Sequence, residues 1–208
     1  LGLRKVRITG GEPLLRQDIH HLVRQLSSME MEVALTTNGS LLEKNAVYLA
    51  ESGLSRVTIS LDAIDQDVHS SITDSQVPVT DILDGISAAV RYEMGPVKVN
   101  CVVQRGVNED QIPKLVRKFR GTGVIVRFIE FMDVGNTNGW TQGQVVPTSE
   151  IIDFLSSEFD LNPLPRQSTS DVATRWAHSD GSGEIGFISS VSQPFCGDCV
   201  RARLSSDG

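Results

Sequence analysis

The chain is short of basic residues and of long apolar runs. It has 19 lysines and arginines against 26 aspartates and glutamates, which gives a formal net charge of −7 at pH 7. Nucleic-acid-binding proteins usually carry a basic surplus that neutralises phosphates, so this balance argues against a nucleic-acid partner. Any basic site must therefore be local. No serine lies in the glycine pattern of a nucleophile elbow, so acyl transfer has no support.

No apolar run approaches the length that a bilayer requires, and no charged-then-apolar leader opens the chain. We therefore expect no membrane contact and a cytoplasmic location. A hydrophobic share of 39% in 208 residues suffices for one α/β domain with or without an appendage. The chain opens on Leu1-Gly2 without a methionine and stops at Asp207-Gly208, a turn signal, so we expect a piece of a longer protein.

Cysteine is scarce, and its spacing points to a metal or redox site. Three cysteines are an odd number, which does not suit a disulfide framework. Cys196-x-x-Cys199 could be half a zinc site, a dithiol redox pair or part of an iron-sulfur ligand set. The nearby cations Arg201 and Arg203 favour thiolates, which need positive surroundings. Cys101 lies among valines and is predicted to be a core thiol.

Apolar periodicity alternates between strand and helix over the first two thirds of the chain. This alternation predicts parallel strands joined by right-handed helical crossovers, in an open sheet or a barrel. A final helix is expected to be capped by Thr148 or Ser149, followed by short strands and turns over residues 159–195. The predicted strands are residues 5–9, 32–37, 56–61, 97–103 and 124–131, and the predicted helices include residues 18–28, 111–120 and 148–158.

Polar residues follow the C-terminal ends of successive strands. In a parallel α/β barrel that edge is where ligands bind, so these residues predict a shared pocket. The glycine pair before Glu12 lets a ligand approach the backbone, and Pro13 holds the Glu12 carboxylate at the strand end. An ordinary βα turn is the alternative. The strand-end residues are Gly11 and Glu12, Thr36 and Asn38, Ser60 and Asp62, and Glu130 and Met132.

Three basic residues lie inside apolar strands, namely Arg7, Lys98 and Arg127. A charge in such a place is costly unless it is paired or reaches a pocket. A structural salt bridge is the alternative for each residue taken alone. Together, in an acidic protein, they predict a cage for an anion such as a polyphosphate.

Six motifs together resemble the GTP 3',8-cyclase family of radical S-adenosylmethionine (SAM) enzymes, which act in molybdenum cofactor biosynthesis. The Gly10-Gly11-Glu12-Pro13 element alone would indicate only the superfamily, whereas the terminal cysteine pair with its Arg-x-Arg points to this family. The motifs are residues 7–13 (RITGGEP), 36–39 (TTNG), 60–62 (SLD), 97–100 (VKVN), 127–132 (RFIEFM) and 195–203 (FCGDCVRAR).

The resemblance implies an α/β fold, an incomplete parallel (β/α) barrel of the radical SAM type with a C-terminal β-rich extension. Residues 1–147 would be the central part of the barrel without its first βα unit, and residues 148–208 the helix and β extension that carries the second-cluster cysteines. The resemblance also implies the family's lyase activity, which converts GTP to 3',8-cyclo-7,8-dihydro-GTP with SAM and two 4Fe-4S clusters. The first cluster reductively cleaves SAM, and the resulting radical takes the 3' hydrogen of GTP.

The family's site residues can be carried over to matching positions of this sequence. Glu12 would lie near the SAM amino group, and Cys196 and Cys199 would be two ligands of the second cluster. The SAM contacts would be Gly11, Ser60 and Met132. The GTP contacts would be Arg7, Thr36, Lys98, Arg127, Arg201, Ala202 and Arg203.

The chain lacks the Cys-x3-Cys-x2-Cys motif that holds the family's first cluster. We expect that motif upstream of Leu1 and a third second-cluster ligand beyond Gly208, so this piece alone should be inactive. The resemblance also implies a reductant protein and a downstream pyranopterin-forming enzyme as partners, and a homodimer is left open. Two alternatives remain: another radical SAM enzyme with an auxiliary cluster, acting for instance on a peptide, or a zinc-stabilised scaffold built on Cys196 and Cys199.

Overall fold

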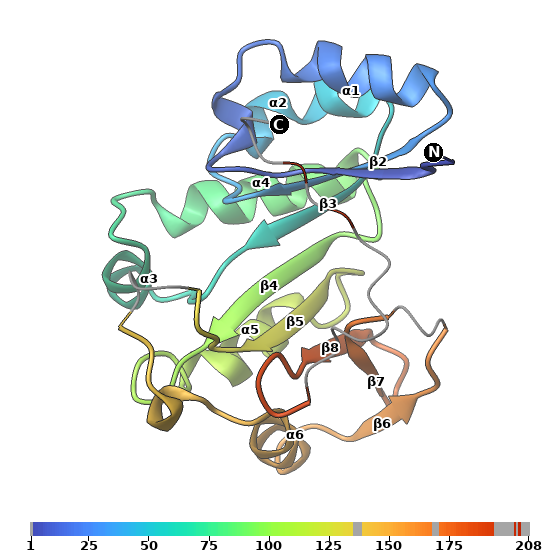
Figure 1. Ribbon diagram of the computed structural model, residues 1–208. Coiled ribbons are helices and arrows are strands. Elements are labelled where there is room, and N and C mark those ends of the chain that lie inside the picture. Colours follow the sequence, from blue (N-terminus) through green and yellow to red (C-terminus); the bar gives the residue numbers. More distant parts are fainter. Residues whose placement is uncertain (1, 135–138, 168–170, 194–201, 203, 205–208) are drawn as a thin grey trace. The chain divides into compact units, whose positions relative to one another are not determined.

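The structure, a computed structural model, describes residues 2–134, 139–167, 171–193, 202 and 204 (Figure 1). The chain divides into two compact units. The first comprises Leu1–Leu61, Ser75–Val99 and Leu204–Gly208, and the second comprises Asp62–Asp74 and Asn100–Arg203. Strand β4, Lys98–Val103, begins in the first unit and ends in the second.

The first unit contains three parallel strands in the order β1-β2-β3. They are β1 Lys5–Ile8, β2 Glu32–Thr37 and β3 Leu54–Ser60. Arg7 lies opposite Ala34, and Thr36 lies opposite Thr58. Because side chains alternate along a strand, this register sends Arg7, Thr36 and Thr58 to the same face.

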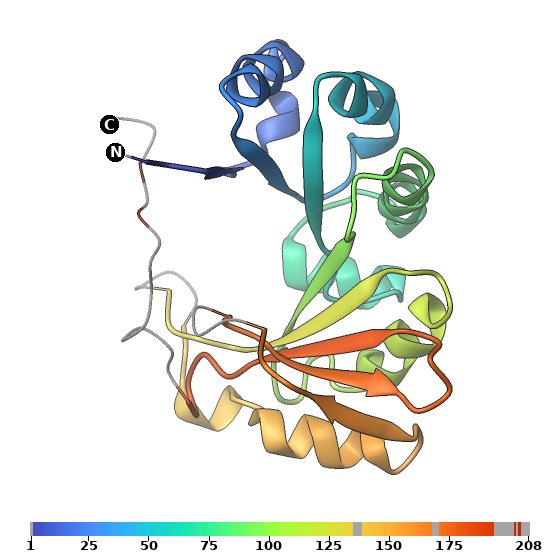
Figure 2. The same cartoon turned by 90° about the vertical axis from the view of Figure 1, so that its right-hand side faces the viewer.

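The two faces of these strands differ in chemistry. Helices α1 Ile19–Ser28, α2 Leu42–Glu51 and α4 Val79–Arg91 lie on one side of the strands (Figure 2). Val33, Leu35, Val57 and Ile59 alternate with the polar set and are almost fully buried. A parallel sheet usually has apolar side chains on both faces, so a polar face signals another use. The polar set is Lys5, Arg7, Glu32, Thr36, Arg56, Thr58 and Ser60.

Helices α2 and α4 approach each other at a glycine. A Cβ on Gly85 would lie 2.7 Å from the carbonyl oxygen of Gly39 and 3.0 Å from the Leu42 Cβ. Gly39 itself has a φ of +83°, in the left-handed region that favours glycine. The missing side chain of Gly85 therefore lets α4 pack against the turn that follows β2.

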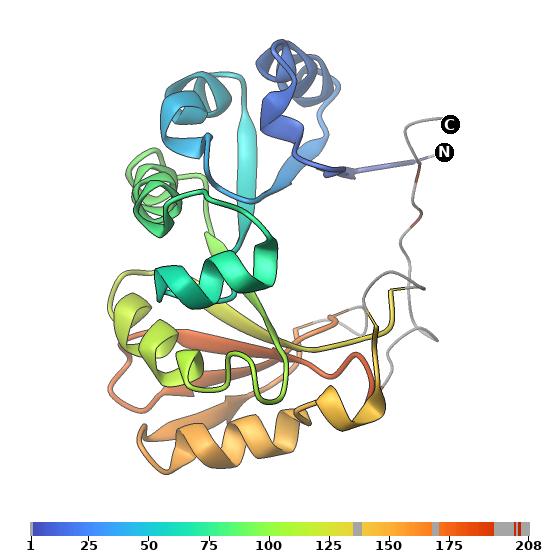
Figure 3. The same ribbon diagram turned by 90° about the vertical axis from the view of Figure 1, so that its left-hand side faces the viewer.

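The second unit contains a mixed sheet. Strand β5, Ile125–Glu130, pairs in parallel with β8, Glu184–Ile188. Strands β7, Thr174–His178, and β6, Leu161–Leu164, continue it in antiparallel fashion. Helices α5, Gln111–Phe119, and α6, Thr148–Ser156, pack against β5 (Figure 3). The remaining elements are α3 Gln66–Thr73 and the short 3-10 helices Pro13–Leu15 and Gln142–Gln144.

The predicted strands are all present, and their bounds differ from the prediction by two residues at most: β2 matches at both ends, whereas β3 begins at Leu54 rather than at residue 56. Helix α3 was not predicted because it is mostly polar; the Asp65 carboxylate caps it by accepting from the amides of Asp67 and Val68. The predicted cap of α6 was wrong, because the helix begins at Thr148 and Pro147 occupies the cap position. Strand β8 was read as part of an appendage, but it extends the sheet alongside β5.

None of the described helices combines the length and the apolar character needed to cross a membrane.

We predict that Gly85→Ala destabilises the chain by about 2 kcal/mol, because the new methyl group overpacks the contact between α2 and α4. Glycine to alanine inside a helix normally stabilises by about 1 kcal/mol, so the sign itself is diagnostic. Urea unfolding followed by circular dichroism measures the change.

Ser87→Ala, at an exposed position of the same helix, is the matched control and should change stability by less than about 0.5 kcal/mol. A stabilising effect of Gly85→Ala would contradict the close packing.

Candidate ligand-binding site

In the first unit, the side chain of Arg7 on β1 contacts a threonine on β2 and a threonine on β3. Its Nη1 donates to Thr36 Oγ1 at 3.0 Å and to Thr58 Oγ1 at 3.2 Å. Thr58 is only 3% exposed, so the second contact fixes the arginine from inside the sheet. The structure thus brings together the predicted pair Arg7 and Thr36. These contacts orient the guanidinium of Arg7.

Thr58 is a site residue that the sequence argument missed. It lies between Arg56 and Ser60 on the polar face of β3. Arg56 forms an ion pair with Glu32, which also pairs with Lys5 at 3.0 Å. The alternation Arg56, Thr58, Ser60 inside a buried strand was the signal that could have identified this face.

Glu12 holds the ends of β1 and β2 together. Its Oε1 accepts from the Thr37 hydroxyl at 2.7 Å and from the Leu14 amide at 3.0 Å, and its Oε2 accepts from the Asn38 amide at 2.7 Å. A carboxylate has about four acceptor positions, so three are already used. Glu12 is therefore first a structural residue of this edge, and its contact with the SAM amino group stays a prediction.

The glycine pair before Glu12 leaves open space at the end of β1. Gly10 has a φ of +150°, and a Cβ on Gly10 or Gly11 would meet nothing within 4 Å. Gly11 and Ser60, at the end of β3, are both exposed. Both predicted SAM contacts of this unit are thus accessible to a ligand.

In the second unit, Arg127 on β5 lies opposite a glycine of the neighbouring strand β8. Its Nε donates to Asn100 Oδ1 at 2.9 Å. Gly186 on β8 lies opposite Arg127, and a Cβ there would come within 2.9 Å of the Arg127 Cγ. The absence of a side chain at position 186 makes room for the arginine. Lys98 is half-buried on β4 and shares the face of Asn100.

Met132 lies just beyond β5 and is 43% exposed. The Trp140 indole N–H donates to the Phe131 carbonyl oxygen at 2.9 Å, which ties the two ends of the following loop together. The side chain of Met132 is therefore presented to solvent next to a fixed backbone, as a ligand contact would require.

Asp62 was predicted at the ligand edge, but its carboxylate has a structural partner. Its Oδ1 accepts from the Val102 amide at 2.7 Å, and burial raises the pKa of this carboxyl. The side-chain amide of Asn108 (Nδ2) donates to the backbone carbonyl oxygens of Asp62 and Val102 at 2.9 Å each. Cys101 is fully buried beside them, and burial raises the pKa of its thiol well above the usual value, which confirms a core thiol.

Glu130 was also predicted at the ligand edge, yet it is fully buried. Its carboxylate accepts hydrogen bonds from the amides of Thr148, Val191 and Ser192 and from the Ser192 hydroxyl. Burial acts to raise the pKa of this carboxyl, but the hydrogen bonds outweigh it and hold the pKa below its usual value. Glu130 faces the core because it shares the parity of Val126 and Phe128 on β5.

The predicted second-cluster residues Cys196 and Cys199 lie outside the described part of the chain, as do Arg201 and Arg203. Ala202 is described and exposed. Among the described residues, no three His, Cys, Asp or Glu side chains form a group that could hold a metal ion. The cage of Arg7, Lys98 and Arg127 draws on both units and stays a prediction, as does the domain boundary at residues 147 and 148.

Two family models match the chain. One is the radical SAM superfamily, over residues 1–119, and the other is Molybdenum Cofactor Synthesis C, over residues 124–208. The first covers more than half of the chain. The chain belongs to the radical SAM superfamily. Its membership agrees with the Gly10-Gly11-Glu12-Pro13 element at the end of β1.

Curated relatives of this radical SAM protein are named GTP 3',8-cyclase. That of Xanthomonas axonopodis pv. citri is 49% identical over 210 residues, covering 100% of this chain and 63% of the relative. Those of Acidothermus cellulolyticus and Staphylococcus haemolyticus are 47% and 46% identical over the whole chain, which covers 58% and 62% of their lengths. The chain thus spans about three fifths of the relatives it matches.

Solved radical SAM structures share the fold at lower identity. A domain of pyruvate-formate lyase-activating enzyme from Bacteroides vulgatus has a TM-score of 0.56 and 21% identity, over 73% of this chain and 92% of that one. A radical SAM methyltransferase from Sphaerobacter thermophilus has a TM-score of 0.56 and 24% identity, over 74% and 47%. These likenesses confirm the predicted fold class, an incomplete parallel (β/α) barrel with a C-terminal β-rich extension.

We predict that Glu130→Gln lowers the free energy of unfolding by about 3 kcal/mol at pH 7, because charge-assisted bonds to a buried carboxylate are lost. The folded-state pKa is depressed, so this stability is present above the unfolded pKa and is lost as the pH falls through the folded pKa. The gap between the two proteins should therefore shrink below about pH 4.5. Urea unfolding across a pH series measures it.

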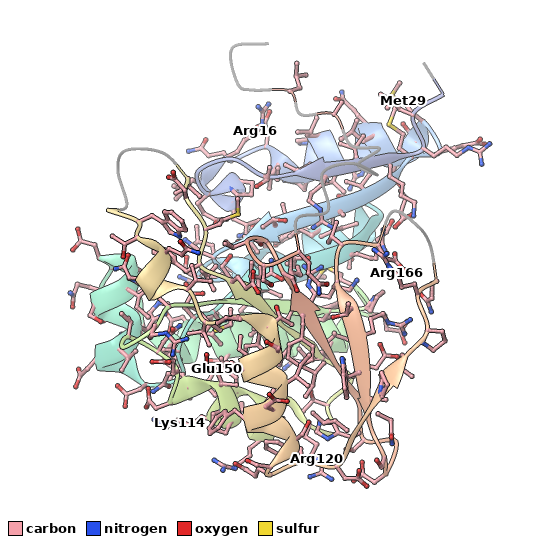
Figure 4. All side chains as sticks on the ribbon, turned by 60° about the horizontal axis from the view of Figure 1, so that its bottom comes forward. Arg16, Met29, Lys114, Arg120, Glu150 and Arg166 are labelled. Atoms are coloured by element: carbon pink, nitrogen blue, oxygen red, sulfur yellow. The ribbon has the colours of Figure 1, made fainter. Side chains whose placement is uncertain are left out.

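Glu150→Gln is the matched control, since Glu150 is an exposed residue of α6 (Figure 4) and pairs with Arg105. It should cost less than about 1 kcal/mol. A stability gap for Glu130→Gln that persists undiminished at pH 3 would contradict the role of the buried charge.

Proposed function

We propose that this chain is the central part of a GTP 3',8-cyclase, the lyase that converts GTP to 3',8-cyclo-7,8-dihydro-GTP in the first step of molybdenum cofactor biosynthesis. The observation that carries the proposal is the match over the whole of this chain, at 46 to 49% identity, to curated relatives of that name, of which it covers 62 to 63%. The polar face of the first unit supports it, because a superfamily scaffold alone does not require an arginine oriented by two threonines.

The substrate is GTP, whose triphosphate needs localised positive charge in an acidic protein. Arg7 is aimed by Thr36 and Thr58, and Arg127 is aimed by Asn100, so each guanidinium is held before the ligand arrives. Such preorganisation lowers the entropy that binding would otherwise cost. The proposed GTP contacts are Arg7, Thr36, Lys98, Arg127, Arg201, Ala202 and Arg203.

SAM is the proposed cofactor, and together with a 4Fe-4S cluster it supplies radical chemistry when bound. The residues present fit it: the backbone at Gly11 is unobstructed, and the side chains of Ser60 and Met132 are exposed at strand ends. We assign these three residues to SAM, and Cys196 and Cys199 to a second 4Fe-4S cluster. The cysteines of the first cluster would lie outside this chain.

The remaining parts of the proposal concern the whole protein. Its partners would be a reductant protein and a downstream pyranopterin-forming enzyme in the cytoplasm, and a homodimer is compatible with it. Residues 1–147 would supply the barrel, and residues 148–208 would carry the second cluster.

In the full-length protein, Arg7→Ala should weaken GTP binding about 10- to 100-fold, the loss expected for one charge-assisted contact. Isothermal titration with GTP measures this change. Lys5→Ala is the matched control, because Lys5 lies on the same face of β1 but pairs with Glu32. Equal losses in both variants, or no loss in either, would count against the assignment of Arg7.

Two alternatives are separated by a second set of measurements. A radical SAM enzyme that acts on a peptide through an auxiliary cluster should tolerate the double change Arg201→Ala and Arg203→Ala, whereas a GTP enzyme should lose GTP binding. A zinc-stabilised scaffold would hold zinc without iron. Counting iron, sulfide and zinc after anaerobic reconstitution of the full-length protein tests the scaffold alternative. Tightly bound zinc without iron would refute the proposed second 4Fe-4S cluster.

A further inference from the structure

We propose that Arg175 is a further contact for the triphosphate of GTP, on the same face of the second unit as Arg127. The inference rests on the proposed function, because it takes GTP to be the anion that Arg127 binds. Arg175 lies outside all six motifs that resemble the family. Its role is inferred from the register of three strands and from the ion pair that holds it.

Arg127 and Arg175 lie on either side of one glycine. Gly186 on β8 is opposite Arg127 of β5 and is also opposite Arg175 of β7. Residues that lie opposite each other on paired strands point to the same side of the sheet, so both arginines project from one face. Neighbouring strands are about 4.8 Å apart, which places the two arginine Cα atoms about 10 Å apart. Two arginine side chains at this separation can approach one phosphate group from opposite sides.

Small residues occupy the sheet between the two arginines. A Cβ built on Gly186 would meet the Arg127 Cγ at 2.9 Å, and its next neighbour outside that arginine is the Ala173 Cβ at 3.7 Å. No side chain of β8 therefore stands between Arg127 and Arg175 at this level of the sheet.

Glu184 orients Arg175 and leaves part of its guanidinium for a ligand. Arg175 Nε donates to Glu184 Oε2 at 3.0 Å, and Arg175 Nη2 donates to both carboxylate oxygens at 2.8 Å. These bonds occupy one edge of the planar fork and fix its plane. Arg175 Nη1, which carries two more N–H groups, has no hydrogen-bond partner in the described part of the chain.

An ion pair that only stabilises the sheet is the alternative explanation. Among the described ion pairs of the second unit, Arg175–Glu184 is the one that joins two strands, and it is the least exposed, at 24% and 31% of the two side chains. Exposed ion pairs contribute little to stability, and withdrawing the charges from water makes a pair more costly. A half-buried pair beside a second arginine is therefore better explained by the oriented cation that it supplies to an anionic ligand.

The two members of the pair separate these explanations. If the pair only stabilised β7 against β8, Arg175→Gln and Glu184→Gln would lower the unfolding temperature alike and leave GTP affinity unchanged. If Arg175 contacts phosphate, Arg175→Gln removes a donor and a positive charge. Glu184→Gln instead removes a negative charge beside the anion, and its carbonyl oxygen can still accept from Arg175. Only the first variant should then bind GTP more weakly.

The test uses the full-length protein, reconstituted anaerobically, with GTP binding followed by isothermal titration. Arg175→Gln should bind GTP about 10- to 100-fold more weakly than the wild type, the loss expected for one charge-assisted contact. Glu184→Gln should bind GTP at least as tightly as the wild type. Arg120→Gln is the matched control, because Arg120 forms an exposed ion pair with Asp180 in the same unit, and its affinity should be unchanged.

A fourth variant covers the case in which Arg175→Gln does not fold. Arg175→Lys keeps the charge but not the planar fork, so it should lose part of the GTP affinity. A ligand series then locates the contact. The loss in Arg175→Gln or Arg175→Lys should recur with inorganic triphosphate and vanish with guanosine, which has no phosphate.

The outcomes distinguish this inference from the proposed function. Wild-type GTP affinity in both Arg175 variants, with a loss in Arg127→Gln, would overturn the inference alone. An equal loss in Arg175→Gln and Glu184→Gln that persists with guanosine would also overturn it, in favour of a structural pair. If the wild-type protein does not bind GTP, the proposed function fails, and this inference fails with it.

Discussion

Backbone amides at the ends of parallel strands need acceptors once strand pairing stops, and a buried amide without one is costly. In this protein, acidic side chains meet that requirement. Glu12 accepts from the amides of Leu14 and Asn38, and Asp62 accepts from that of Val102. Glu130, the last residue of β5, accepts from three amides, one at the start of α6 and two in the turn after β8. Some of the acidic residues of this chain thus serve as hydrogen-bond acceptors for backbone amides near the strand ends.

Successive residues of one strand have different roles in this protein. On β5, Val126 and Phe128 fill the core, Arg127 points to the other face, and Glu130 secures the following elements. The same division occurs on the strands of the first unit, where apolar residues face the helices and Arg7 meets two threonines. Chemistry and packing are separated by the two-residue repeat of the strand, so either can change without repacking the other.

Much of the fold could be predicted because apolar periodicity is strong in these strands and helices. Family motifs named both Arg7 and Thr36 as ligand contacts, and the structure brings the two together. Thr58 was missed, because its contact with Arg7 depends on the register of three strands, which no single strand reveals. The parallel pairing of β8 with β5 was missed because the apolar periodicity of a segment predicts a strand but not which strand it pairs with, nor in which direction. Glu130 was misplaced although its parity with Phe128 on β5 already pointed to the core.

Gly186 has a consequence for how this protein could be altered. The stem of Arg127 passes where a side chain on the neighbouring strand would otherwise stand. The reach of the guanidinium is therefore controlled from a position that carries no functional group. A side chain added at position 186 would displace the stem of Arg127, and so its guanidinium, while the arginine and its asparagine partner stay unchanged in sequence.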